Sequence, residues 1–141
     1  MNKKHRVLVC DDNGLVRASV QEFLKHQADI RVVGDASGGQ AGIHAALVLL
    51  PDLVLMDVTM PEVDGIEATR QIMAKAPAIK VLAYSGERRW AIVKRMFAAG
   101  ARGYVLKQGD PGELVCAIRV VLAGGSFLSP RLMGTTPPWW V

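Results

Sequence analysis

Residues Leu53-Val54-Leu55-Met56-Asp57 form a continuous apolar run that ends in an acid. Four apolar residues without alternation are typical of a strand that is buried on both faces. Residues Val7-Leu8-Val9-Cys10-Asp11-Asp12 repeat this form near the start of the chain. Strands of this kind occur in parallel sheets that have helices packed on both sides.

Strand-like and helix-like segments alternate on both sides of residues 53–57. We expect strands at residues 6–10, 30–36, 53–56, 81–83 and 103–106, and helices at 15–25, 41–50, 65–75, 90–99 and 113–123. The last helix has a marked start, because Asp110 is a suitable N-cap and Glu113 can complete a capping box. The alternation predicts an α/β fold, a doubly wound (βα)5 arrangement in which a five-stranded parallel sheet carries helices on both faces.

Length and composition indicate one globular domain. The chain has 141 residues, of which 50% are hydrophobic and 21% charged. We expect the domain to span residues 1–131, and a linker or flexible tail with Trp139 and Trp140 to span residues 132–141. The longest strictly apolar run, residues 45–50, is too short to cross a membrane. The apolar run that begins at Val7 ends at Asp11, far short of a secretory signal, so we expect a cytoplasmic protein without membrane contact.

Charge and cysteine content exclude further classes. The net charge is +4, but the basic residues are scattered and form no zinc-finger or RNA-binding motif, so we expect no direct nucleic-acid binding by this chain. The densest basic group is predicted to be a solvated helix face, open to a protein partner: Arg88, Arg89, Lys94 and Arg95. Cys10 and Cys116 support neither a disulfide scaffold nor a four-ligand zinc site, and both are predicted to be buried, unreactive thiols.

Polar side chains follow four of the five expected strands. Asp11 and Asp12 follow the first, Asp57 the third, Ser85 the fourth and Lys107 the fifth. Taken singly, Asp12 or Asp57 is best explained as a helix cap. Capping does not require the whole set, and the carboxyl ends of parallel strands meet at one rim of a sheet. We therefore expect these side chains to share one small site.

The charges of this set indicate its chemistry. Two like charges 4 Å apart repel by about 4 kcal/mol at an effective dielectric constant near 20. A hard divalent cation such as Mg²⁺ relieves this repulsion, since it prefers carboxylate oxygens, water and phosphate. Ser85 can donate its hydroxyl to a phosphoryl oxygen, and Lys107 can offset the charge of a carboxylate or a phosphoryl group. An aspartate nucleophile, a metal and a lysine together indicate phosphoryl transfer onto a carboxylate.

At these residues the sequence resembles the response-regulator receiver domain of bacterial two-component signalling, over about residues 5 to 130. The family's fold is flavodoxin-like. The matching motifs are Val7–Asp12, Asp57–Pro61 with Asp64-Gly65, Tyr84–Gly86, and Gly103–Lys107. Residues 123–130 resemble the exit from the last receiver helix in NarL/FixJ-type regulators, and we expect this chain to lack the helix-turn-helix output domain that follows there.

The resemblance implies a role for each acidic residue. Asp57 would accept a phosphoryl group from a histidine kinase. Asp11, Asp12, Asp57 and the backbone carbonyl of Thr59 would hold Mg²⁺. The implied function is a phosphorylation-controlled switch in transcriptional regulation, with the histidine kinase and possible homodimers as partners. The resemblance implies that the chain is not an enzyme and takes part only in its own phosphotransfer and autodephosphorylation.

The resemblance also implies a switch. Ser85 and Lys107 would contact the phosphoryl group, and movement of Ser85 would empty space for Tyr104, which matches the family's aromatic switch. From the residues alone, Tyr104 fits equally well as a half-buried strand aromatic.

Two other functions fit the same fold. The first is a Mg²⁺-dependent phosphohydrolase with an aspartate nucleophile, although Thr59 stands where haloacid-dehalogenase-type phosphatases have a second Asp. The second is a flavin- or nucleotide-binding module, although Asp11-Asp12-Asn13-Gly14 stands where such modules have a glycine-rich phosphate loop.

Overall fold

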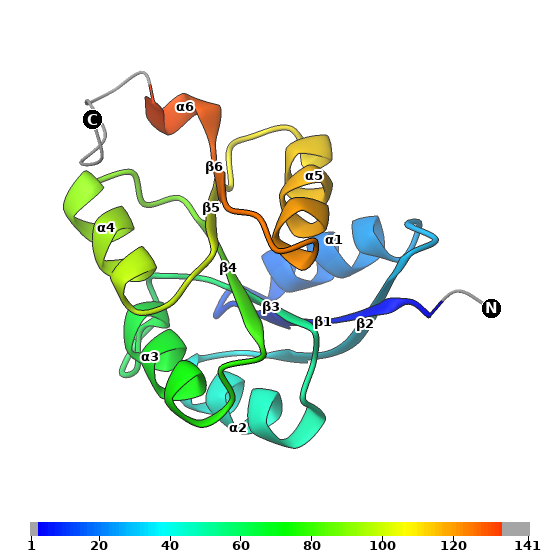
Figure 1. The fold of residues 1–141 in the computed structure, drawn as a ribbon, viewed down its shortest axis with the longest axis horizontal. Helices are drawn as coiled ribbons and strands as arrows, with labels where there is room; N and C mark the ends of the chain where they lie inside the picture. The colour runs from blue at the N-terminus through cyan, green and yellow to red at the C-terminus, as the bar shows by residue number, and fades with distance from the viewer. Residues whose placement is uncertain (1–2, 134–141) are drawn as a thin grey trace.

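Six parallel strands form one sheet in residues 3–133, the part of the chain that the structure, a computed structural model, describes (Figure 1). The strand order is β2-β1-β3-β4-β5-β6. The bounds are β1 His5–Cys10, β2 Ile30–Ala36, β3 Leu53–Met56, β4 Lys80–Ser85, β5 Gly103–Leu106 and β6 Phe127–Leu128.

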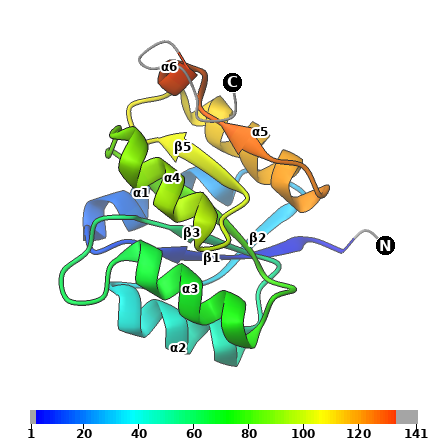
Figure 2. The ribbon, with the colours of Figure 1, turned by 60° about the vertical axis from the view of Figure 1, so that its left-hand side comes forward.

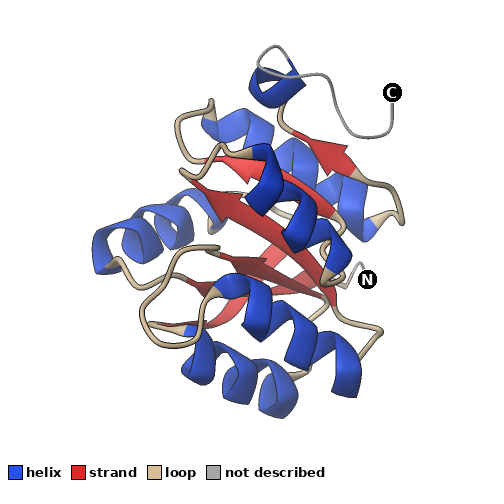
Figure 3. Cartoon of the chain, turned by 90° about the vertical axis from the view of Figure 1, so that its left-hand side faces the viewer, coloured by secondary structure: helices blue, strands red, loops and turns tan. Residues whose placement is uncertain are grey.

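Helices cover both faces of this sheet (Figure 3). They are α1 Gly14–Leu24, α2 Gly39–Leu49, α3 Gly65–Lys75, α4 Trp90–Ala98, α5 Pro111–Leu122 and α6 Pro130–Met133. Helices α1 and α5 pack on one face, and α2, α3 and α4 pack on the other. The predicted doubly wound, flavodoxin-like α/β fold is confirmed.

The strand β3 shows why apolar runs form the centre of the sheet. All four of its residues are at most 1% exposed. Val54 and Met56 pack in the cluster under α2, α3 and α4, whereas Leu53 and Leu55 pack under α1 and α5. Because successive side chains of a strand point to opposite faces, a strand buried on both faces needs an apolar residue at every position.

The sheet has one strand more than the five that we expected. Strand β6 follows α5 and pairs with β5 through only two residues, Phe127 and Leu128, which is too short for a recognisable pattern. The short helix α6 follows, and its Leu132 is fully buried although we expected the linker to begin there. Trp139 and Trp140 lie outside the described residues.

Helix starts are capped by residues other than the acids of the expected site. The Asn13 side chain accepts the backbone N–H of Leu15 at 2.9 Å at the start of α1. The Asp64 side chain accepts the N–H of Glu67 at 2.8 Å at the start of α3. Capping, the simplest explanation for a single aspartate after a strand, therefore does not account for the acids of the site.

The prediction that both cysteines are buried is wrong for Cys116. Cys10 is buried, but Cys116 is exposed on α5. Its neighbours Val115 and Ala117 face the sheet, while the helical rotation turns Cys116 towards solvent.

None of the helices within residues 3–133 has the length and apolar character needed to cross a membrane.

Candidate functional site

Three carboxylates meet at the carboxyl ends of β1 and β3, which are neighbours in the sheet. One oxygen from each of Asp11, Asp12 and Asp57 lies within 4.8 Å of the other two. Asp11 and Asp57 are buried, at 2% and 5% exposed, whereas Asp12 is exposed. Topology brings them together, because residues 45 positions apart in the sequence follow adjacent parallel strands.

Lys107 joins this cluster from the end of β5. Its Nζ lies 2.7 Å from Asp11 Oδ2 and 3.4 Å from Asp57 Oδ1. Burial alone would lower the pKa of Lys107, but the two carboxylates outweigh it, and the pKa is raised above its usual value. Lys107 is therefore a cation at neutral pH.

The carboxyl group of Asp57 has a pKa well above its usual value. Burial raises its pKa to about 6; Lys107 opposes this change and the charge of Asp11 adds to it. At neutral pH most Asp57 is ionised, with only partial charge compensation. An ionised carboxylate at the edge of a hollow has the chemistry that a nucleophile needs.

The hollow beside Asp57 measures about 330 Å³. Its lining residues are Asp57, Thr59, Ser85, Gly86, Glu87 and Lys107. Ser85 is the last residue of β4, the strand next to β3 in the sheet. We had expected it to follow the strand instead. Its Oγ accepts the backbone N–H of Glu87 at 3.1 Å, and the hydroxyl can also donate to an oxyanion.

Tyr104 contacts the loop that follows Ser85 and is fully buried. It is therefore not the half-buried strand aromatic that the sequence also allowed. Its hydroxyl donates to the carbonyl of Glu87 at 2.8 Å. Burial raises the pKa of Tyr104 to about 12, against a smaller lowering by a hydrogen bond with Ser85. The backbone of Glu87 thus connects Ser85 with Tyr104.

The side chain of Glu87 is held by Arg89. Both carboxylate oxygens of Glu87 lie 2.9 Å from guanidinium nitrogens of Arg89. The hydrogen bonds from the Arg89 side chain, and then from its backbone, lower the pKa of Glu87 to about 2. Glu87, the fourth acid near the hollow, is therefore ionised, and Arg89 compensates its charge.

Arg17 is a residue that our sequence reasoning missed. Its Nη1 donates to the backbone carbonyl of Asp11 at 2.7 Å, and its Nε donates to Asp35 at 2.9 Å. Because helical side chains point towards the helix N-terminus, Arg17 on α1 reaches back to the end of β1. That direction was the one available signal, and it is weak in a chain with many basic residues.

The donor set fits a hard divalent cation. Asp11, Asp12 and Asp57 supply oxygen ligands from two adjacent strand ends, and Thr59, which also lines the hollow, is exposed. Carboxylate and carbonyl oxygens are the ligands that Mg²⁺ takes in proteins. The described part of the chain therefore has a site with the chemistry that Mg²⁺ needs.

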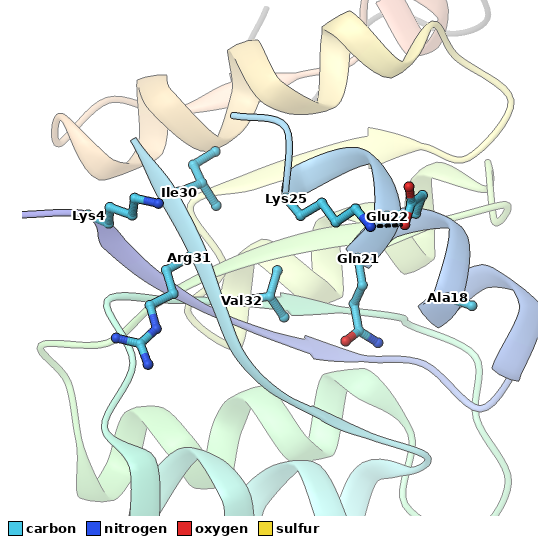
Figure 4. A pocket seen from close by; sticks show the side chains of 8 residues that line it. All are labelled: Lys4, Ala18, Gln21, Glu22, Lys25, Ile30, Arg31 and Val32. Carbon is cyan, nitrogen blue, oxygen red and sulfur yellow. Dashed lines mark ion pairs between the residues drawn. The ribbon is translucent and has the colours of Figure 1, made fainter. Parts of the chain in front are cut away.

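A larger hollow, of about 560 Å³, lies between α1 and the edge strand β2 (Figure 4). Lys4, the residue before β1, and Arg31 of β2 line one side of it, and the ion pair between Lys25 and Glu22 lines it from α1 and the residue after it. None of the carboxylates of the cluster contributes to its lining. The groups that can carry out chemistry lie at the smaller hollow.

Comparison with known proteins agrees with this geometry. Residues 7–119 match the model of the response regulator receiver domain. Response regulator GacA of Pseudomonas viridiflava is 42% identical over 127 residues, which are 90% of this chain and 59% of GacA, so the chain spans less than two thirds of that relative.

Two solved structures share the fold and about a third of the sequence. A two-component response regulator of the LuxR family from Aurantimonas is 34% identical, with a TM-score of 0.89 and 94% of each chain covered. The receiver domain of the response regulator NarL from Mycobacterium tuberculosis is 33% identical, with a TM-score of 0.83 and 86% and 98% coverage of the two chains. These relatives give no support to the phosphohydrolase alternative. The chain belongs to the response regulator receiver domain family.

Proposed function

We propose that the chain is a phosphorylation-controlled signalling switch in which Asp57 accepts a phosphoryl group from a histidine kinase. The observation that carries this proposal is the position of Asp57, whose carboxylate is buried beside a hollow and lies 3.4 Å from the ammonium group of Lys107. With a pKa of about 6, Asp57 is mainly ionised at neutral pH and has the lone pair needed for attack.

The transfer moves one phosphoryl group between two side chains. An Asp57 oxygen attacks phosphorus, and the phosphorus–nitrogen bond of the phosphohistidine breaks. The imidazole nitrogen keeps the electron pair and takes up a proton, and Asp57 becomes an acyl phosphate. Ser85 donates its hydroxyl to a phosphoryl oxygen, and Lys107 exchanges part of its contact with Asp57 for one with the new phosphoryl group.

Asp11, Asp12, Asp57 and the backbone carbonyl of Thr59 would hold Mg²⁺. The bound ion would stabilise the charge that develops on the phosphoryl oxygens. Arg17 keeps the Asp11 backbone in place, and Lys107 offsets the charge of Asp11 before the ion binds.

Phosphorylation is read through Ser85, Glu87 and Tyr104. The phosphoryl group adds charge and acceptor oxygens beside Ser85, and the hydrogen bonds of Glu87 extend that change to Tyr104 and the start of α4. We propose transcriptional regulation as the output, which is what the name of the Brevibacillus brevis relative DegU, 34% identical, states for that protein. A second copy of the chain is the proposed partner of the switched surface. Phosphotransfer onto and hydrolysis from Asp57 are the only reactions we propose for the chain.

A small phosphodonor tests the proposal. Incubation with acetyl phosphate and Mg²⁺ is expected to add the mass of one phosphoryl group per chain in intact-mass spectrometry. Asp57→Asn is expected to add none, while the matched control Asp52→Asn, at the opposite end of β3, is labelled like the wild type. Labelling of Asp57→Asn, or continuous turnover of a phosphoester far beyond one equivalent, would contradict the proposal.

A further inference from the structure

The start of α5 departs from the expected capping box. The Asp110 side chain accepts the backbone N–H of Gly112 at 2.8 Å, so the N-cap is present. Glu113 does not complete the box. Its carboxylate instead accepts the hydroxyl of Ser129, a residue beyond the end of the helix.

Ser129 fixes the segment after α5 onto β5. It is fully buried, and its Oγ, besides donating to Glu113, accepts the backbone N–H of Leu106 at 3.2 Å. Its own N–H donates to the carbonyl of Tyr104 at 2.9 Å. A buried polar group with every partner in place ties its neighbours to one arrangement, because losing one partner leaves the others unpaired in a low-dielectric interior.

Arg131 extends these contacts to the two loops of the phosphoryl site. One is the loop that follows Ser85, and the other is the loop that follows Lys107. Its Nη1 donates to the carbonyl of Gln108, the residue after Lys107, at 3.0 Å. Its own carbonyl accepts the guanidinium of Arg88, the residue after Glu87, at 3.5 Å. Figure 2 shows α6 at the end of the sheet where α4 begins.

The same segment closes the apolar cluster around Tyr104. Leu132 is fully buried in the cluster that contains Tyr104, and Leu128 packs against that cluster. Residues 127–132 therefore contact Tyr104 through the backbone of β5 and share its apolar cluster, in addition to contacting the two loops.

We propose that residues 127–132, here the docking segment, position the two loops of the phosphoryl site. Ser129 and Arg131 are positioning residues that favour the arrangement with Lys107 beside Asp57 and Tyr104 buried. Because this arrangement already points Ser85 and Lys107 into the hollow, docking of the segment and binding of a phosphoryl group favour each other. This inference rests on the proposed function and extends it by naming the part of the chain that reads and supports the site.

Linkage makes the proposal measurable in both directions, because two coupled binding events change each other's affinity by the same factor. Beryllofluoride with Mg²⁺ is the probe of the phosphoryl site. In the wild type it is expected to slow amide hydrogen exchange in residues 127–132. Arg131→Ala, which changes an exposed side chain, is expected to weaken beryllofluoride binding about 5-fold. Arg131→Lys keeps a donor for Gln108 and is expected to recover part of that loss.

The controls separate this inference from the proposed function. Arg119→Ala, which removes an exposed arginine of α5 bound to Asp29, is expected to bind beryllofluoride as the wild type does. Ser129→Ala is expected to show a larger loss than Arg131→Ala, with circular dichroism to confirm folding. If wild type binds beryllofluoride and Asp57→Asn does not, the proposed function stands. Unchanged exchange in residues 127–132, or equal affinities of wild type, Arg131→Ala and Arg119→Ala, would then overturn the positioning role.

Discussion

The hydroxyl group of Tyr104 donates a 2.8 Å hydrogen bond to the backbone carbonyl of Glu87. This bond connects β5 with the loop that follows Ser85. Glu87 also donates its N–H to Ser85 Oγ. The backbone of Glu87 is therefore held by Ser85, which lines the hollow, and by the buried Tyr104.

Replacing Tyr104 by Phe is expected to lower the free energy of unfolding by about 1–2 kcal/mol, because the apolar ring stays packed and one hydrogen bond is lost. Tyr104→Ala is expected to lower it by about 3–5 kcal/mol, since it also leaves a cavity. Urea denaturation measures both. No loss for Tyr104→Phe would show that the hydroxyl adds nothing to stability, and equal losses for the two variants would show that the buried ring adds nothing beyond the hydroxyl.

Asp57 predicts a specific pH dependence of stability in EDTA. Its pKa rises from 3.8 to about 6 on folding, so folding favours the protonated form. The stability that this group contributes is fully present below about pH 4 and is lost as the pH rises through about 6. Relative to Asp57→Asn, the wild type should lose up to about 3 kcal/mol of unfolding free energy across this range. Urea midpoints at several pH values check this, and a flat or rising difference would contradict it.

Mg²⁺ is expected to stabilise the wild type against heat in proportion to the logarithm of its concentration. Asp12→Asn should weaken Mg²⁺ binding at least about tenfold, or about 1.4 kcal/mol, while the metal-free variant is no less stable, because a repulsive charge is gone. Melting curves over a Mg²⁺ series measure both effects. Asp29→Asn, which changes a partly exposed acid just before the amino end of β2, is the control and should respond to Mg²⁺ as the wild type does.

Gly65→Ala is expected to distort the loop after β3. A Cβ at position 65 would lie 2.0 Å from the carbonyl oxygen of Asp57 and 2.8 Å from Val58 Cα, and both are backbone atoms that cannot rotate away. We expect a loss of about 2–3 kcal/mol and weaker Mg²⁺ binding. Gly38→Ala is the matched control, with open space around the added carbon, and should change stability by less than about 1 kcal/mol. Thermal and metal-binding measurements that fail to distinguish the two variants would refute the steric argument.

The strands and the meeting of the acids were predictable because both depend on simple periodicity. The four apolar residues of β3 require burial on both faces, and the parallel topology then carries Asp57 to the same rim as Asp11. Strand β6 was not predictable, since two residues give no period. The contact between Glu113 and Ser129 also lay beyond the sequence, because Glu113 satisfied a local capping motif equally well.

Cys116 shows a different limit. Apolar neighbours suggested a buried thiol, but in a helix the residues next to a position in sequence lie on other sides of the cylinder. Arg17 was missed for a related reason, because its contact with Asp11 depends on the direction of a long side chain across one helical turn.

Helix capping by Asn13 and Asp64 separates chemistry from scaffolding in this domain. Since neither of these residues belongs to the acidic cluster, Asp12 and Asp57 can be replaced without removing a helix cap, whereas Asp11 supports the cap of α1 by accepting the backbone N–H of Asn13 at 2.9 Å. A lineage could therefore silence phosphorylation and still inherit an intact module, which makes loss of signalling without loss of folding an accessible evolutionary route for this architecture.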